Sequence, residues 1–238
     1  MTHRRLVAAA IGALLGLAVS SGAWAQAVLQ TVTVRVKPGQ MSTYRERIAV
    51  LQGVMDRVGG QGRLQVWNAT LAGTGTGNTL VSVAYPSLVA YAETTAKASA
   101  DPEWQKILAG LDEIRTVVSS GLIASRDGGG VPPAAESGSV LQGALVRVNP
   151  GQLDAYLKRI ESLKGILARL GSSSTIRVWQ ATLAGEATGT VAVGITHPSL
   201  AAYAENTTRL QADAEAGKLL QGLDEIRTLV SSSLFVSP

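Results

Sequence analysis

The 238 residues include 21 Lys and Arg against 17 Asp and Glu, and 46% of all residues are hydrophobic while 16% are charged. This hydrophobic share is too high for a disordered chain, and the small net charge gives no basic surface for binding nucleic acid. The chain has no cysteine, which excludes disulfides and cysteine-based catalysis, redox chemistry and metal binding.

The N-terminus has the layout of a secretory signal. A basic start at Thr2–Arg5 precedes an apolar run over Leu6–Val19, and Ala23-Trp24-Ala25 provides a small-x-small cleavage pattern. The apolar run of about 14 residues is shorter than the roughly 20 that span a bilayer, which disfavours the alternative of an uncleaved anchor. The sequence therefore predicts cleavage after Ala25, a periplasmic or secreted protein, and no stable membrane association after cleavage.

The rest of the chain is an internal duplication. Residues Leu29 to Ser125 align without a gap to Leu141 to Ser237, and Gly110–Thr116 recurs letter for letter as Gly222–Thr228. Self-similarity over such lengths indicates tandem copies of one structural unit. The predicted organisation is a signal peptide (1–25), a first repeat (28–125), a flexible Gly- and Pro-containing linker (126–138) and a second repeat (139–238).

Both repeats predict the same order of elements, with the second copy 112 residues after the first. Alternating hydrophobic residues predict strands, and hydrophobic residues three or four apart predict helices. In the first repeat we expect strands over 29–36, 64–71 and 80–85, a helix over 41–58, a second helix from Ser87 that is interrupted at Asp101-Pro102, and a fourth, edge strand that ends near Ser125. The second repeat lacks that proline, so its break should be softer.

The glycine-rich stretch at 73–78 superficially resembles a dinucleotide-binding loop. Such a loop must be followed by a helix, whereas residues 80–85 have the pattern of a strand. A hairpin turn is therefore the better interpretation.

The order β-α-β-β-α-β is that of a ferredoxin-like unit, an antiparallel sheet with both helices on one face. Each unit leaves the other face of its sheet uncovered, and two units can cover these faces by packing sheet to sheet. The predicted fold class is therefore α+β, with two tandem ferredoxin-like units forming a monomeric pseudo-dimer.

The Tyr-Pro-Ser-Leu helix start at 85–88 and the Asp-Pro-Glu-Trp turn at 101–104 resemble the dimeric α/β-barrel superfamily, especially its antibiotic-biosynthesis-monooxygenase-like and NIPSNAP-like groups. The resemblance implies an α/β barrel that this chain forms from its own two halves. That superfamily includes cofactor-independent oxygenases, isomerases, haem-handling enzymes and non-catalytic binding domains. None of their catalytic signatures matches this sequence, so the resemblance carries over the fold only.

Strand alternation predicts one candidate binding site. Arg35 and its copy Arg147 should point away from the helices and into the barrel, and Trp67 and Trp179 occupy matching positions on the second strands. An arginine beside a tryptophan would suit a small aromatic or anionic ligand. The alternative is that the tryptophans fill a core and the arginines extend to its rim.

Other candidate groups are weaker. His197 replaces Tyr85 of the first repeat, and both belong to the candidate ligand-binding set. His197 is the only histidine after residue 25, however, and a metal site needs two or three ligands, so we expect neither a metal nor a cofactor. Asp112-Glu113 and its copy are better suited to capping or to ion pairs with Arg115 and Arg227 than to acid/base catalysis.

The functional prediction is an exported protein that binds a small molecule. A cofactor-independent monooxygenase-like or isomerase-like enzyme and a structural or interaction protein are the alternatives. Because the repeats differ at polar and aromatic positions, notably Tyr85/His197, Trp104/Ala216 and Gln65/Arg177, the two half-sites should be unequal.

Overall fold

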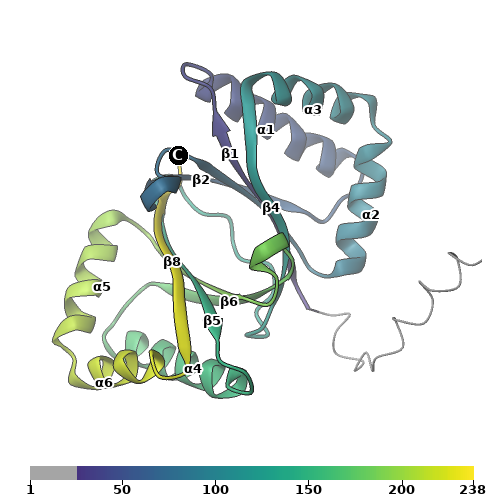
Figure 1. Ribbon diagram of the computed structural model, residues 1–238. Helices are drawn as coiled ribbons and strands as arrows, with labels where there is room; N and C mark the ends of the chain where they lie inside the picture. Colours follow the sequence, from purple (N-terminus) through teal and green to yellow (C-terminus); the bar gives the residue numbers. More distant parts are fainter. Residues whose placement is uncertain (1–25) are drawn as a thin grey trace, which may run out of the picture.

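A computed structural model describes residues 26–238, so the predicted signal peptide and its cleavage site lie outside the described residues (Figure 1). The first unit comprises β1 (Val28–Val36), α1 (Met41–Arg57), β2 (Arg63–Leu71), the 3-10 turn η2 (Gly73–Gly75), β3 (Thr79–Tyr85), α2 (Leu88–Ser99), α3 (Pro102–Ile114) and β4 (Arg115–Ser125). The second comprises β5 (Val140–Val148), α4 (Leu153–Arg169), β6 (Thr175–Leu183), the 3-10 turn η3 (Gly185–Ala187), β7 (Val191–His197), α5 (Leu200–Ala212), α6 (Ala214–Leu223) and β8 (Arg227–Val236). The predicted ferredoxin-like order is confirmed in both units. No helix in the range 26–238 is both long and apolar enough to cross a membrane.

The second helix of each unit is divided in two, as the sequence predicted. In the first unit the Asp101 carboxylate accepts hydrogen bonds from the backbone N–H groups of Glu103 (2.8 Å) and Trp104 (3.3 Å), and Pro102 occupies the first turn of α3. Carboxylate capping and a proline at this position both start a new helix. In the second unit Asp213 alone separates α5 from α6 and caps α6 through Ala216 N–H (2.9 Å).

The eight strands close into one antiparallel barrel in the order β1-β3-β2-β8-β5-β7-β6-β4. The two units are joined where β2 pairs with β8, for example Asn68 with Val236, and where β4 pairs with β6, for example Ser125 with Trp179. β4 and β8 are the edge strands of their own units, as predicted, and each also pairs with a strand of the opposite unit. This pairing satisfies backbone groups that an open edge would leave exposed.

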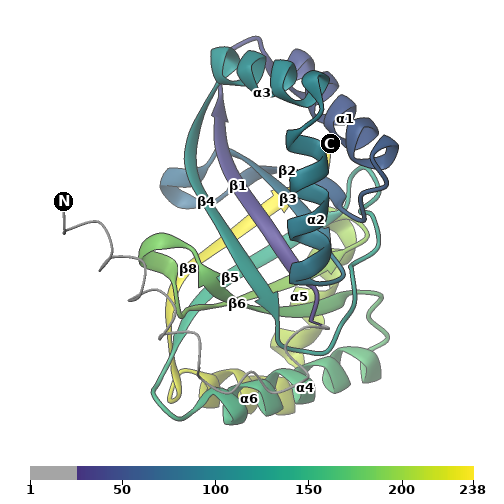
Figure 2. The same ribbon diagram turned by 90° about the vertical axis from the view of Figure 1, so that its right-hand side faces the viewer.

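The helices lie outside the barrel, those of one unit on the opposite side from those of the other (Figures 1 and 2). Val34 of β1 and Val146 of β5 are fully buried beneath them, together with Tyr44 of α1 and Tyr156 of α4. Tyr44 and Tyr156 are thus core residues of their units. Because side chains alternate along a strand, the neighbouring residues point into the barrel.

Candidate functional site

The barrel encloses a cavity of about 770 Å³, within the range of pockets that bind small molecules. Inward-facing residues of all eight strands contribute to its wall. Hydroxyl groups on the wall come from Thr31, Thr33, Ser82, Ser119, Ser120, Thr175, Thr196, Ser231 and Ser233. Most of the wall surface is apolar, so the cavity offers separate hydrogen-bonding groups on a mainly apolar wall.

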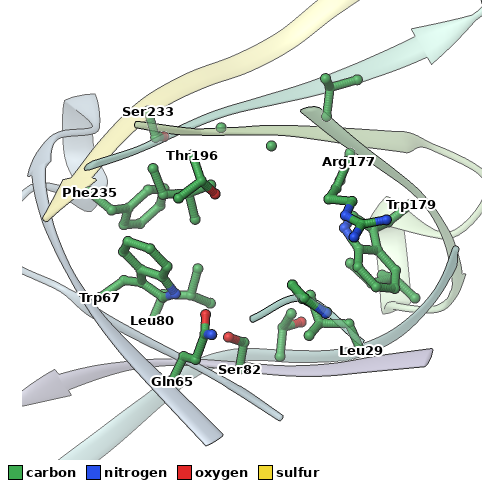
Figure 3. Close-up of a pocket in the computed structure, with 18 of the residues that line it drawn as sticks. Leu29, Gln65, Trp67, Leu80, Ser82, Arg177, Trp179, Thr196, Ser233 and Phe235 are labelled. Carbon is green, nitrogen blue, oxygen red and sulfur yellow. The ribbon is translucent and has the colours of Figure 1, made fainter. Parts of the chain in front are cut away.

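Trp67 and Trp179 both line this cavity and are only 3% and 5% exposed. Figure 3 shows Trp67 and Phe235 on one side and Trp179 on the other. Trp179 also packs against Ile123 and Ala181. The tryptophans thus fill part of the interior and at the same time present aromatic surface to the remaining space.

Arg35 and Arg147 do not lie where strand alternation predicted. Both are solvent-exposed and neither lines the cavity, and Arg35 Nε donates a hydrogen bond to Asn78 Oδ1 at 3.3 Å. Alternation gave the correct face, because Thr31 and Thr33 of the same strand line the cavity. The arginines, however, lie near the ends of their strands, beyond the enclosed part of the barrel. Alternation gives the face of the sheet on which a side chain lies but not its position along the barrel axis.

The arginine that does line the cavity is Arg177 on β6, two residues before Trp179. It lies on the same side of the cavity as Trp179 (Figure 3), and no other lysine or arginine of residues 26–238 contributes to the wall. Its guanidinium makes no ion pair or side-chain hydrogen bond within the described range. The sequence signal for its inward direction is its position two residues before Trp179, on the same face of the strand. The first repeat has Gln65 at this position, so Arg177 is not among the arginines that both repeats share.

The linker between the units crosses one mouth of the barrel. Residues 132–136 line the cavity, and Gln65 Nε2 donates a hydrogen bond to Pro133 O at 2.7 Å. At its start the linker passes directly against the Arg177 guanidinium at Gly129, where any side chain would collide with it. Flexibility of the linker stays a prediction, but its path makes it part of the site.

Asp127 anchors the start of this linker. Its side chain is 6% exposed and accepts hydrogen bonds from Ser125 Oγ (3.0 Å), Gly129 N–H (3.2 Å), Val178 N–H (3.3 Å) and Lys164 Nζ (3.4 Å). Burial alone raises the pKa of the Asp127 carboxyl, but these donors and nearby positive charge outweigh it, so the pKa is lowered. Asp127 is therefore held as a carboxylate.

Tyr85 and His197 occupy matching positions on the helix side of the sheet. Tyr85 packs edge-on against Tyr91 and His197 against Tyr203, each with ring centroids 5.3 Å apart. His197 also borders the cavity, but its Nδ1 is 2.7 Å from Ser174 Oγ and its Nε2 is buried without a partner. Neither ring nitrogen is thus presented to the cavity as a ligand for haem or a metal. Burial lowers the pKa of His197 and is the main cause that raises the pKa of Tyr85 to about 12.

The adjacent carboxylates lie outside the site. Asp112 is 3.7 Å from Arg115, and Asp224 is 3.8 Å from Arg227, which confirms the predicted ion pairs. Within residues 26–238, no three His, Asp or Glu side chains are grouped as metal ligands would be.

No family model and no curated protein sequence matches the chain. Solved structures do match it. An anthrone oxidase-like protein is 14% identical, with a TM-score of 0.62 over 90% of this chain and 92% of that one. A proposed monooxygenase of Fusobacterium nucleatum is 11% identical, with a TM-score of 0.60 over 90% and 94% of the two chains. A proposed chlorite dismutase is 9% identical, with a TM-score of 0.54 over 90% and 95%.

At these identities the similarity establishes the fold. The monooxygenase and anthrone oxidase-like structures have the dimeric α/β-barrel fold that the sequence resemblance predicted. The chain is therefore a dimeric α/β barrel in which both ferredoxin-like halves belong to a single polypeptide.

Proposed function

We propose that the protein is exported and then binds one small aromatic or anionic molecule inside the barrel. The observation that carries this proposal is the cavity of about 770 Å³, which combines two buried tryptophans with one arginine, Arg177. Protein interiors are normally close-packed, and empty cavities are normally apolar. A mainly apolar space of this size with hydroxyl groups and a guanidinium on its wall is suited to a ligand that combines an apolar ring with a polar group.

A cavity of this kind favours ligand binding over a purely structural role, because a structural protein would be more stable with a filled apolar interior. The enzyme alternative has some support, because two structurally similar proteins are described as monooxygenases. Among the described residues of the cavity wall, however, Glu136 is the only carboxylate, and it lies exposed on the linker. The wall offers binding groups but no paired acid and base.

Ligand binding should be visible through the two cavity tryptophans. We expect aromatic acids to quench the fluorescence of the 26–238 protein, and W67A or W179A to weaken binding about 5–10-fold by loss of ring contacts worth around 1 kcal/mol. W104A is the matched control: Trp104 lies on α3, outside the barrel, and the second repeat has Ala216 at the same position. Absence of quenching and of calorimetric heat across a panel of charged and neutral aromatic compounds would rule out the proposal.

Export is tested separately. Cleavage after Ala25 should leave Gln26 as the first residue, which intact-mass measurement of protein from the extracytoplasmic fraction will detect. Recovery of a full-length chain that begins at Met1, confined to the membrane fraction, would contradict it.

A further inference from the structure

We infer that the ligand is a planar aromatic carboxylate held in one half of the cavity, with its carboxylate on Arg177 and its ring over Gly194 and Gly143. This inference rests on the proposed binding function and specifies the chemistry and position of the guest. It follows from a comparison of equivalent rows of residues in the two repeats.

In the second unit, register places four cavity-lining residues in one row across β6, β7, β5 and β8: Arg177, Gly194, Gly143 and Ser233. The equivalent row across β2, β3, β1 and β4 of the first unit is Gln65, Ser82, Thr31 and Gly121. The row of the first unit therefore has Ser82 and Thr31 where the row of the second unit has Gly194 and Gly143.

The two glycines leave the wall beside Arg177 without side chains of its own. Adjacent strands are about 4.8 Å apart, so two neighbouring glycines form a strip roughly 10 Å wide. A Cβ on Gly194 would lie 3.1 Å from Leu141 Cδ1 and a Cβ on Gly143 would lie 3.5 Å from Phe235 Cε2, so a ring on this strip would contact both side chains. In the other half, Ser82 and Thr31 project into the space and the Gln65 side chain is already bonded to Pro133 O.

The N–H groups of Arg177 are available to a ligand, because no ion pair or side-chain hydrogen bond within the described range uses them. The positive charge of Arg177 helps to lower the pKa of Asp127, but that carboxylate takes its hydrogen bonds from Ser125, from backbone N–H groups and from Lys164 at 3.4 Å. The other charged residue of the wall, Glu136, is exposed on the linker and makes no ion pair within the described range. A guanidinium with free N–H groups matches a carboxylate in a two-bond arrangement.

Ser233, at the far end of the row, indicates that the ligand carries a second polar substituent. Ser233 lies three strand spacings from Arg177, about 14 Å between backbones. A benzoate with one substituent opposite its carboxylate is shorter than this interval and fits within it. A ring hydroxyl opposite the carboxylate would reach the Ser233 hydroxyl, so 4-hydroxybenzoate is the probe of choice.

Calorimetric titration with 4-hydroxybenzoate and its neutral analogue 4-hydroxybenzamide tests this assignment. R177Q, which installs the residue that the first repeat has, should weaken binding of the benzoate about 10–100-fold and change that of the amide less than about 3-fold. The G143T/G194S variant installs the first repeat's side chains on this strip and should weaken binding of both probes. R147Q, which removes an exposed arginine outside the cavity, should change neither.

The outcomes separate this inference from the proposed function. If both probes bind the parent protein equally and R177Q leaves the benzoate affinity unchanged, the carboxylate assignment is wrong while the cavity remains a binding site. An equal loss in R147Q would also overturn it, because the effect would then reflect net charge alone. If the parent protein binds neither these probes nor any member of the wider aromatic panel, the proposed function itself fails.

Discussion

Replacement of Asp127 by alanine is expected to lower the free energy of unfolding by about 1–3 kcal/mol, the usual cost of leaving buried hydrogen-bond donors without their acceptor. The change leaves Lys164 without its partner in the linker and deprives the N–H groups of Gly129 and Val178 of their acceptor. Urea unfolding measures the loss, and amide hydrogen exchange at Gly129 and Val178 locates it at the linker. E136Q on the same linker is the control and should be neutral. An Asp127→Ala protein as stable as the parent would show that the linker is not anchored in this way.

The same anchor predicts acid sensitivity. Because the pKa of Asp127 is lower in the folded protein than in the unfolded chain, its stabilising contribution is complete above the unfolded-state value, about 3.9. The contribution is lost as the pH falls through the folded-state pKa. The parent protein should therefore lose stability below about pH 4 more steeply than D127N.

Replacement of His197 by tyrosine, the residue of the first repeat, should lower the free energy of unfolding by about 1–3 kcal/mol through overpacking. In the first repeat, Gly62 makes room for the tyrosine: a Cβ there would lie 2.8 Å from Tyr85 Cε1. Its counterpart in the second repeat is Ser174, whose hydroxyl is hydrogen-bonded to His197. A tyrosine at 197 would meet the Ser174 side chain and remove that bond.

A double-mutant cycle tests this explanation. Adding S174G to H197Y should restore most of the lost stability, whereas S174G alone should destabilise the protein because it breaks the bond to His197. Thermal unfolding of the four proteins gives the coupling energy. If the effects of the two substitutions are additive, the side chains at 174 and 197 are not coupled, which would contradict this explanation.

The elements and their order could be predicted because each rests on a local pattern that occurs twice. Pro102 and Asp101 predicted the helix break, and the alternation along β1 predicted the inward face on which Thr31 and Thr33 line the cavity. Such signals depend only on neighbours in the sequence.

The missed features depend on distance along the barrel and on contacts between the repeats. Arg35 lies on the correct face but near the strand end, and no pattern within one strand tells where the barrel wall stops. The pairing of β4 with β6 and the path of the linker over the mouth arise only when both units are in place. The importance of Arg177 appears when its row, with Gly194 and Gly143, is compared with the equivalent row of the other unit.

Native mass spectrometry of the mature protein, purified without denaturation from the cells that make it, tests the central claim most directly. We predict a monomeric chain that carries one small molecule, released on denaturation and absent from R177Q prepared in the same way. The bare chain mass in every preparation, together with no uptake of 4-hydroxybenzoate or of any other aromatic compound from the panel, would contradict a ligand-binding barrel.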